Sequence, residues 1–89
     1  MTRKRFITLE GGEGAGKSTQ ARRLAARLED NGHKVLVTRE PGGSPGAETI
    51  RKLIVSGDAG RWTPKAESLL IFAAREDHLA RTIRPALDR

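Results

Sequence analysis

The 89-residue sequence contains no cysteine and few aromatic residues, and each absence excludes a class of protein. Without cysteine, the chain has no disulfide, no zinc–thiolate site and no thiol nucleophile. Tyrosine is also absent, and the only aromatic residues are Phe6, Trp62 and Phe72. A surface that stacks nucleic-acid bases normally has more aromatic side chains than this. The two histidines, His33 and His78, have no partners at the spacing of a metal site, so we expect no histidine-bound metal.

Long apolar runs are missing as well. Behind the basic N-terminal residues, the apolar run extends only from Phe6 to Leu9 and ends at Glu10. Such a run is too short for a signal peptide or a membrane span. We therefore expect a soluble, cytoplasmic protein with no membrane partner.

Acidic residues are in the minority, since 11 Asp and Glu stand against 17 Lys and Arg, and the formal net charge is +6. This balance favours partners that carry phosphate, either nucleotides or nucleic acid. The basic residues form no stripe, because they are spread from Arg3 to Arg89 with only small groups between. A basic nucleic-acid-binding module is therefore the weaker alternative, and we expect no nucleic-acid partner.

The first half of the sequence alternates apolar runs with loops. Phe6–Leu9 and Val35–Thr38 are short runs with β propensity, which suit strands of a parallel sheet. Between them, residues 18–30 have apolar side chains at helical spacing, and Asn31-Gly32 would end that helix. The order strand, loop, helix, strand is the βαβ unit of an open parallel sheet.

The second half predicts loops and two helices. Arg39–Gly46 has the composition of turns, and a short helix is expected over Ala47–Val55. Thr63 and Pro64 suit the N-cap and the first position of a long helix that extends to Ile83 and that Pro85 would end.

Only two strands are predicted, and two parallel strands leave both edges of a sheet open and cover little apolar area. We therefore interpret residues 1–89 as the N-terminal part of a single domain, truncated before a third strand.

Residues Gly11–Ser18 fit the phosphate-loop pattern G-x-x-x-x-G-K-[ST], between a predicted strand and a predicted helix. Glycines let backbone N–H groups converge on phosphates, and the start of the helix adds its positive dipole end. Lys17 is expected to reach the β- and γ-phosphates and Ser18 to bind Mg²⁺. The expected ATP-phosphate site is Gly11, Gly12, Glu13, Gly14, Ala15, Gly16, Lys17, Ser18 and Thr19.

A phosphate loop occurs in GTPases, ATP-driven machines and many small-molecule kinases, so by itself it does not identify the reaction. Three stretches narrow this choice: EGGEGAGKSTQ, TREPGG and ESLLIFAAREDH followed by IRPAL. In this order and spacing they closely resemble the N-terminal half of bacterial thymidylate kinases, along essentially all 89 residues.

The resemblance implies an α/β fold, that of the P-loop nucleoside monophosphate kinases, in which helices flank a parallel sheet. It implies that the full-length protein transfers the ATP γ-phosphate to dTMP, giving dTDP, with Mg²⁺ as cofactor. ATP and dTMP are then the partners, and the full-length protein is a homodimer. The lid, third strand and adenine-binding region of the family have no counterpart in residues 1–89, so we expect this chain alone to be inactive.

The resemblance also implies roles for residues of the phosphate loop. The family's loop carboxylate falls on Glu13, which is associated with the sugar 3′-OH of dTMP and with the transfer region. Glu13 and Lys17 are thus the expected catalytic residues. Some members have an arginine in the loop where this sequence has Gly14, so we expect that arginine to come from a lid elsewhere.

Further along the chain, the resemblance implies a dTMP-binding set. Glu40 and Pro41 of TREPGG approach the monophosphate and base, and Arg39 is a further candidate for a phosphate contact. Arg51 matches an arginine that holds the dTMP phosphate, and Arg75 matches one that reads a thymine carbonyl.

The base-stacking aromatic of the family departs from its usual position, which is four residues before Arg75. That position is Ile71 here, and the neighbouring Phe72 is the aromatic residue. Either Phe72 stacks on thymine from a shifted angle, or Ile71 packs on it while Phe72 belongs to the core. Asp88-Arg89 looks like the family's Asp-Arg pair, but it follows a predicted helix and not a strand, so we interpret it as a coincidence.

Two alternatives to a dTMP kinase stay open. One is a nucleotide-binding fragment or pseudo-enzyme without catalysis. The other is a kinase for a different nucleoside monophosphate.

Overall fold

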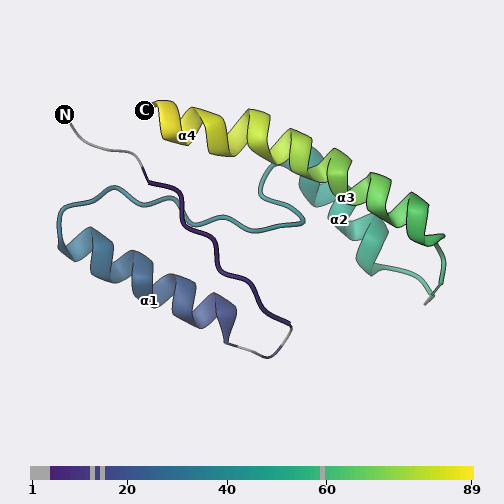
Figure 1. Cartoon of the computed structure of the whole chain (residues 1–89), viewed down its shortest axis with the longest axis horizontal. Coiled ribbons are helices and arrows are strands. Elements are labelled where there is room, and N and C mark those ends of the chain that lie inside the picture. Colours follow the sequence, from purple (N-terminus) through teal and green to yellow (C-terminus); the bar gives the residue numbers. More distant parts are fainter. Residues whose placement is uncertain (1–4, 13, 15, 59) are drawn as a thin grey trace. The chain divides into compact units, whose positions relative to one another are not determined.

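The computed structural model describes residues 5–12, 14, 16–58 and 60–89. The chain divides into two compact units, Met1–Val37 and Thr38–Arg89. The first unit contains helix α1, and the second contains α2, α3, a short π-helix and α4 (Figure 1).

Helix α1 spans Lys17–Asp30, in agreement with the predicted helix 18–30. Its end is also confirmed, because Asn31 is the C-cap and its side-chain amide donates to Arg27 O at 2.9 Å. Gly32 follows with φ 88°, a left-handed conformation that glycine adopts without steric cost.

The two predicted strands are wrong for this structure, as is the sheet they would form. Residues 6–9 and 35–38 run as extended chain (Figure 1), and no β-strand occurs among the described residues. Their apolar side chains are uncovered, with Phe6 60% and Leu36 51% exposed. The physical reason is that a parallel pair is stable only where further strands and helices cover it, and the described residues supply no further strand.

Helix α2 spans Pro45–Val55. It begins two residues before the predicted start because the Ser44 hydroxyl accepts from Ala47 N at 3.3 Å and Pro45 occupies the first helical turn. The prediction of a turn at Ser44-Pro45 is wrong because the same residue types favour turns and helix starts.

Helix α3 spans Pro64–His78, and its predicted start is confirmed, because Thr63 Oγ1 accepts from Ala66 N at 3.2 Å. The predicted end at Pro85 is wrong. The helical chain continues through a π-helix, Leu79–Ile83, into α4, Arg84–Asp88. Pro85 has no N–H for an α-helical bond, and the wider π-turn before it, closed by Arg84 N–H and Leu79 O, accommodates the proline.

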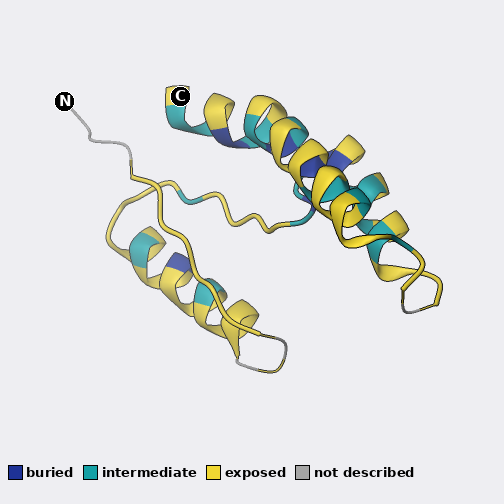
Figure 2. Cartoon of the chain, turned by 45° about the vertical axis from the view of Figure 1, so that its right-hand side comes forward, coloured by how far each residue is buried: buried dark blue, intermediate teal, exposed yellow. Residues whose placement is uncertain are grey.

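Helix α2 packs against α3, and most of the buried residues lie in this pair, in the π-helix and in the loop before α2 (Figure 2). Ala47 and Ala74 are 0% and 1% exposed, and such small side chains let two helices approach closely. Ser44 and His78 are the buried polar side chains of the described part. The second unit therefore has a small, partly polar core.

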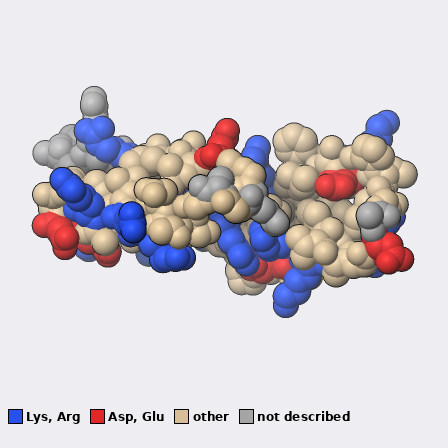
Figure 3. All heavy atoms as spheres, turned by 90° about the horizontal axis from the view of Figure 1, so that it is seen from below, with Lys and Arg blue, Asp and Glu red and all other residues tan. Residues whose placement is uncertain are grey.

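Charges on the face shown in Figure 3 are mixed, with Lys and Arg in separate groups and Asp and Glu among them. In the second unit, three arginines form ion pairs with carboxylates: Arg39 with Glu48, Arg75 with Glu40 and Arg81 with Asp77. No helix within the described ranges has the length and apolar character needed to cross a membrane.

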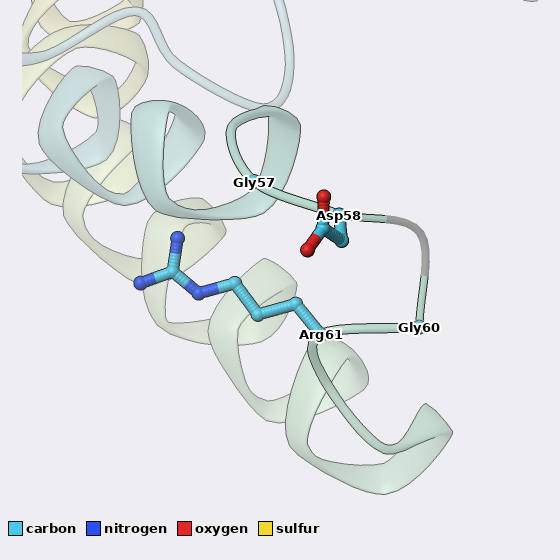
Figure 4. Close-up of a pocket in the computed structure, with 4 residues that line it drawn as sticks. All are labelled: Gly57, Asp58, Gly60 and Arg61. Atoms are coloured by element: carbon cyan, nitrogen blue, oxygen red, sulfur yellow. The ribbon is translucent and has the colours of Figure 1, made fainter.

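The loop between α2 and α3 forms an open hollow lined by Gly57, Asp58, Gly60 and Arg61 (Figure 4). Trp62 ties this loop to α2, because its Nε1 donates to Leu53 O at 3.0 Å. The Arg61 guanidinium lies over the Trp62 ring, 5.3 Å from its centroid. The hollow is at the opposite end of α2 from Ser44.

Candidate functional site

The phosphate loop leads directly into α1. Gly14 and Gly16 have φ 79° and 82°, so both positions require glycine for the backbone conformation. A Cβ built on either would meet nothing within 4 Å, which leaves the space beside the loop backbone open. Glu13 and Ala15, which the sequence assigned to this site, lie outside the described residues.

The start of α1 presents donors to that space. The first helical hydrogen bond runs from Gln20 N to Gly16 O at 3.0 Å, so the preceding N–H groups have no partner within the helix. No acidic side chain occupies the first turn. Lys17 Nζ donates to Gly11 O at 3.1 Å, which holds the ammonium group over the loop. Backbone N–H groups, the helix dipole and a lysine together favour a bound polyphosphate.

In the second unit, the segment Thr38–Ser44 forms a loop against α2 and α3, called here the 38–44 loop. Its Glu40–Pro41 peptide bond is cis. Arg51 of α2 donates from Nη1 to Pro41 O at 2.8 Å. The loop thus brings Pro41 next to an arginine ten residues further along the chain.

The Glu40 carboxylate connects this loop to α3. Its Oε1 accepts from Arg75 Nε at 2.7 Å, and its Oε2 lies 2.9 Å from His78 Nδ1. Partial burial raises the pKa of Glu40, but the hydrogen bonds from His78 and Arg75 outweigh it and hold the pKa below the ordinary value. Glu40 is therefore an ionised carboxylate with one donor on each oxygen.

His78 is 1% exposed and is satisfied at both ring nitrogens. Its Nε2 lies 2.7 Å from Thr38 Oγ1, and its Nδ1 faces Glu40. A buried imidazole with two fixed partners is held in one orientation.

Glu48 of α2 holds the middle of the 38–44 loop. Its two oxygens accept from Arg39, at 2.7 Å from Nη2 and 3.3 Å from Nε, and Oε2 also accepts from Gly43 N at 2.8 Å. The hydrogen bond from Arg39, followed by that from the Gly43 amide, lowers the pKa of Glu48 to about 2.

The end of the loop is fixed by α3 and the π-helix. Ser44 Oγ donates to Asp77 Oδ2 at 2.6 Å, and Arg81 Nε donates to Asp77 Oδ1 at 3.0 Å. Thr82 Oγ1 donates to Gly43 O at 2.6 Å. One α3 surface therefore contacts the loop from Thr38 to Ser44.

Comparison with known proteins places this arrangement in a family. The family model described as thymidylate kinase matches residues 9–89. The chain belongs to the thymidylate kinase family. It is accordingly a member of the P-loop nucleoside monophosphate kinases, as the sequence predicted.

Individual thymidylate kinases are similar along nearly the whole chain. That of Caulobacter vibrioides is 67% identical over 89 residues, which is 100% of this chain and 43% of the relative. That of Rhizorhabdus wittichii is 66% identical over 84 residues, 94% of this chain and 40% of the relative. That of Dinoroseobacter shibae is 64% identical over 83 residues, 93% of this chain and 40% of the relative. The chain thus spans about two fifths of the length of these thymidylate kinases.

The structure brings together part of the dTMP-binding set expected for a thymidylate kinase. Glu40 contacts Arg75, and Pro41 contacts Arg51, so these four residues form one cluster in the second unit. The described phosphate-loop residues belong to the first unit. Three residues of the set remain. Glu13 lies outside the described residues, and Ile71 and Phe72 lie on α3, where Ile71 is half-buried and Phe72 is 63% exposed.

Three residues that organise the cluster were not predicted from the sequence: Thr38, Glu48 and His78. A signal existed for His78, which lies three residues after Arg75 and so on the same side of the helix. Glu48 lies three residues before Arg51 on α2, which is the same relation. Neither spacing shows that His78 and Glu48 contact the 38–44 loop, because tertiary contacts set the path of that loop.

Proposed function

We propose that this chain is the N-terminal part of a thymidylate kinase that transfers the ATP γ-phosphate to dTMP, giving dTDP. The observation that carries the proposal is the cluster of Glu40, Pro41, Arg51 and Arg75, in a chain of this family. Two guanidinium groups around a carboxylate-bearing loop suit a ligand with a phosphate at one end and hydrogen-bonding carbonyls at the other.

In this proposal the phosphate loop holds the ATP phosphates. Lys17 neutralises charge on the β- and γ-phosphates, and the N–H groups at the start of α1 bind the same anion. Stabilising charge and fixing the phosphates account for most of what a protein contributes to phosphoryl transfer. Glu13 is proposed to act beside Lys17 at the sugar 3′-OH and the transfer region.

Magnesium fits the donors that the chain offers. Ser18 is exposed at the start of α1, and a hydroxyl oxygen is a hard ligand of the kind Mg²⁺ prefers. No group of three or more His, Cys, Asp or Glu able to hold a metal occurs among the described residues. Ser18 and the nucleotide phosphates would therefore hold the ion, whose chemistry is to neutralise charge on the transferring phosphate.

At the dTMP end, we propose that Arg51 binds the phosphate and Arg75 a thymine carbonyl, with Glu40 fixing Arg75. Arg39 is the weaker candidate for a phosphate contact, because Glu48 already occupies two of its nitrogens. Phe72 is exposed enough to meet a base, whereas Ile71 is half-buried. We therefore favour Phe72 as the thymine contact.

For the full-length protein, we further propose a cytoplasmic homodimer whose fold includes a parallel sheet. The exposed apolar side chains of residues 6–9 and 36–37 support the sheet, since additional strands would cover them. Gly14 in place of an arginine supports a catalytic arginine from a lid outside this chain.

The test is a coupled assay of ADP release by the full-length protein, with dTMP, dUMP, UMP and AMP as acceptors. The proposal predicts the highest kcat/KM for dTMP. Arg75→Met should raise KM for dTMP roughly tenfold or more while KM for ATP stays unchanged. Arg84→Met, which alters an exposed arginine of α4, is the matched control.

Two results would contradict the proposal. A higher kcat/KM with another monophosphate would indicate a kinase of different specificity. ATP binding without transfer to any acceptor would indicate a pseudo-enzyme.

A further inference from the structure

We propose that His78 is a positioning residue of the dTMP-binding cluster: it fixes the Glu40 carboxylate so that its second oxygen holds Arg75. This inference rests on the proposed function, because it concerns the orientation of a residue that would read the base. His78 itself does not touch the substrate.

The burial of His78 is the first observation. It is the largest fully buried side chain of the described part. Burying an imidazole in such a place is unfavourable unless both nitrogens have partners. A leucine would fill the same volume without that requirement. The imidazole is therefore better explained by what it holds than by packing.

The ionised state of Glu40 fixes the direction of its hydrogen bond with His78. The Glu40 carboxylate is ionised and can only accept, so His78 Nδ1 carries a proton and donates over 2.9 Å. In the neutral ring, Nε2 then accepts from the Thr38 hydroxyl at 2.7 Å. Hydrogen bonds thus connect four side chains in a row: Thr38, His78, Glu40 and Arg75.

Arg75 is the last side chain of this hydrogen-bonded row. Only its Nε is used, at 2.7 Å from Glu40 Oε1, and neither Nη group makes a hydrogen bond among the described residues. The side chain is 52% exposed, so a ligand can reach it. If His78 released Oε2, the carboxylate would be free to rotate and Arg75 would lose its fixed orientation.

Gly43 adds an independent constraint. A Cβ at Gly43 would overlap the His78 ring and the Thr38 hydroxyl, so the 38–44 loop closes directly over the imidazole. The loop and the ring therefore fix each other's position.

The experiment compares His78→Asn with His78→Gln in the full-length protein. Asn places an amide N–H close to the position of Nδ1 and keeps the donor to Glu40, whereas Gln reaches the position of Nε2 and keeps only the Thr38 contact. Each variant leaves one former partner unsatisfied, so their losses of stability should be similar. Thr63→Ala, which removes a remote helix cap, controls for lost stability alone.

We expect His78→Gln to raise KM for dTMP roughly tenfold, with a smaller change in kcat and none in KM for ATP. His78→Asn should stay within about threefold of the parent KM. Equal values for the two variants, or a Gln variant indistinguishable from the parent, would overturn the proposal while the kinase function stood.

A second readout needs no activity. The side-chain Nε–H of Arg75, followed by ¹⁵N NMR without ligand, should stay protected from exchange in His78→Asn and lose protection in His78→Gln. Equal protection in the two variants overturns the proposal, even for a full-length protein that fails to phosphorylate dTMP. If neither variant folds, the parent protein still provides a test. The absence of a proton on His78 Nδ1 there would overturn the proposal.

Discussion

At Gly43, backbone conformation and packing both require glycine. Its φ of 89° lies in the left-handed region, and a Cβ there would overlap the His78 ring and Thr38. Its N–H donates to Glu48 and its carbonyl accepts from Thr82. The position therefore couples α2, α3 and the π-helix through one residue without a side chain.

Gly43→Ala should lower the free energy of unfolding of the full-length protein by more than Gly60→Ala. Gly60 has φ 82° but open space around its Cβ, so its substitution should cost only the left-handed strain of about 1–2 kcal/mol. Gly43→Ala adds overpacking of about 1–3 kcal/mol. Urea denaturation of both variants measures the difference, and equal losses would show that the loop does not close over His78.

Glu48 should make stability depend on pH in the acid range. Its pKa is lowered to about 2 in the folded protein, against about 4.3 in an unfolded chain. Its contribution is therefore complete above about pH 5 and is lost as the pH falls towards 2. Glu48→Gln should reduce stability at pH 7, and its difference from the parent should shrink as the pH is lowered.

Denaturant unfolding of the parent and Glu48→Gln at several pH values provides that measurement. Glu76→Gln, which alters an exposed carboxylate of α3, is the matched control and should change stability little. A parent–variant difference for Glu48 that stays constant down to about pH 3 would contradict the account.

At the scale of elements, the caps of α2 and α3 differ in what else they do. Ser44 caps α2 and also donates to Asp77 of α3, whereas Thr63 caps α3 and is exposed. Ser44 is 5% exposed, so its loss also leaves a buried gap. The N-cap of α2 is thus a tertiary contact as well as a local one.

Ser44→Ala should cost about 1–2 kcal/mol of stability, and Thr63→Ala about 0.5–1 kcal/mol. Thermal or urea unfolding of the two full-length variants compares them directly. A Thr63 variant that loses as much stability as the Ser44 variant would show that the bond to Asp77 contributes nothing.

Local sequence signals predicted the helices well and the tertiary contacts poorly. The apolar stripe and Asn31-Gly32 predicted α1, and Thr63-Pro64 predicted the start of α3, because each depends on neighbouring residues. Pro85 misled the prediction of the helix end, since the π-turn that accommodates it leaves no local pattern. Strands depend on partners far away in sequence, so a strand-like run such as Phe6–Leu9 can remain unpaired.

In the candidate site too, contiguous motifs were predicted from the sequence and tertiary contacts were not. The phosphate loop is a contiguous motif, and the resemblance to thymidylate kinases supplied Glu40, Arg51 and Arg75. The contacts of Glu48 and His78 connect residues brought together only by the loop's path across α2 and α3, so they required the structure.

At the scale of the whole molecule, the apolar side chains of residues 6–9 and 36–37 in the first unit are exposed. Ile7 is 53% and Val37 51% exposed, and their burial would normally stabilise a parallel sheet. The chain spans about two fifths of the length of the thymidylate kinases it matches. We infer that the rest of a full-length kinase covers these side chains.

The 89-residue chain alone should therefore show no dTMP-dependent ADP release, whereas the full-length protein should. It should also bind a hydrophobic dye such as ANS more strongly per mole, because its apolar side chains are uncovered. Measurable dTMP kinase activity of the 89-residue chain would contradict this expectation.

The central claim is that the chain supplies the phosphate loop and the dTMP-binding cluster of a thymidylate kinase. It is tested most directly by ³¹P NMR of the full-length protein incubated with ATP, Mg²⁺ and dTMP. The account predicts that the β-phosphate signal of dTDP grows as that of the ATP γ-phosphate disappears, and that Lys17→Met slows this transfer roughly 100- to 1,000-fold. A folded protein that binds ATP but forms no dTDP would contradict it.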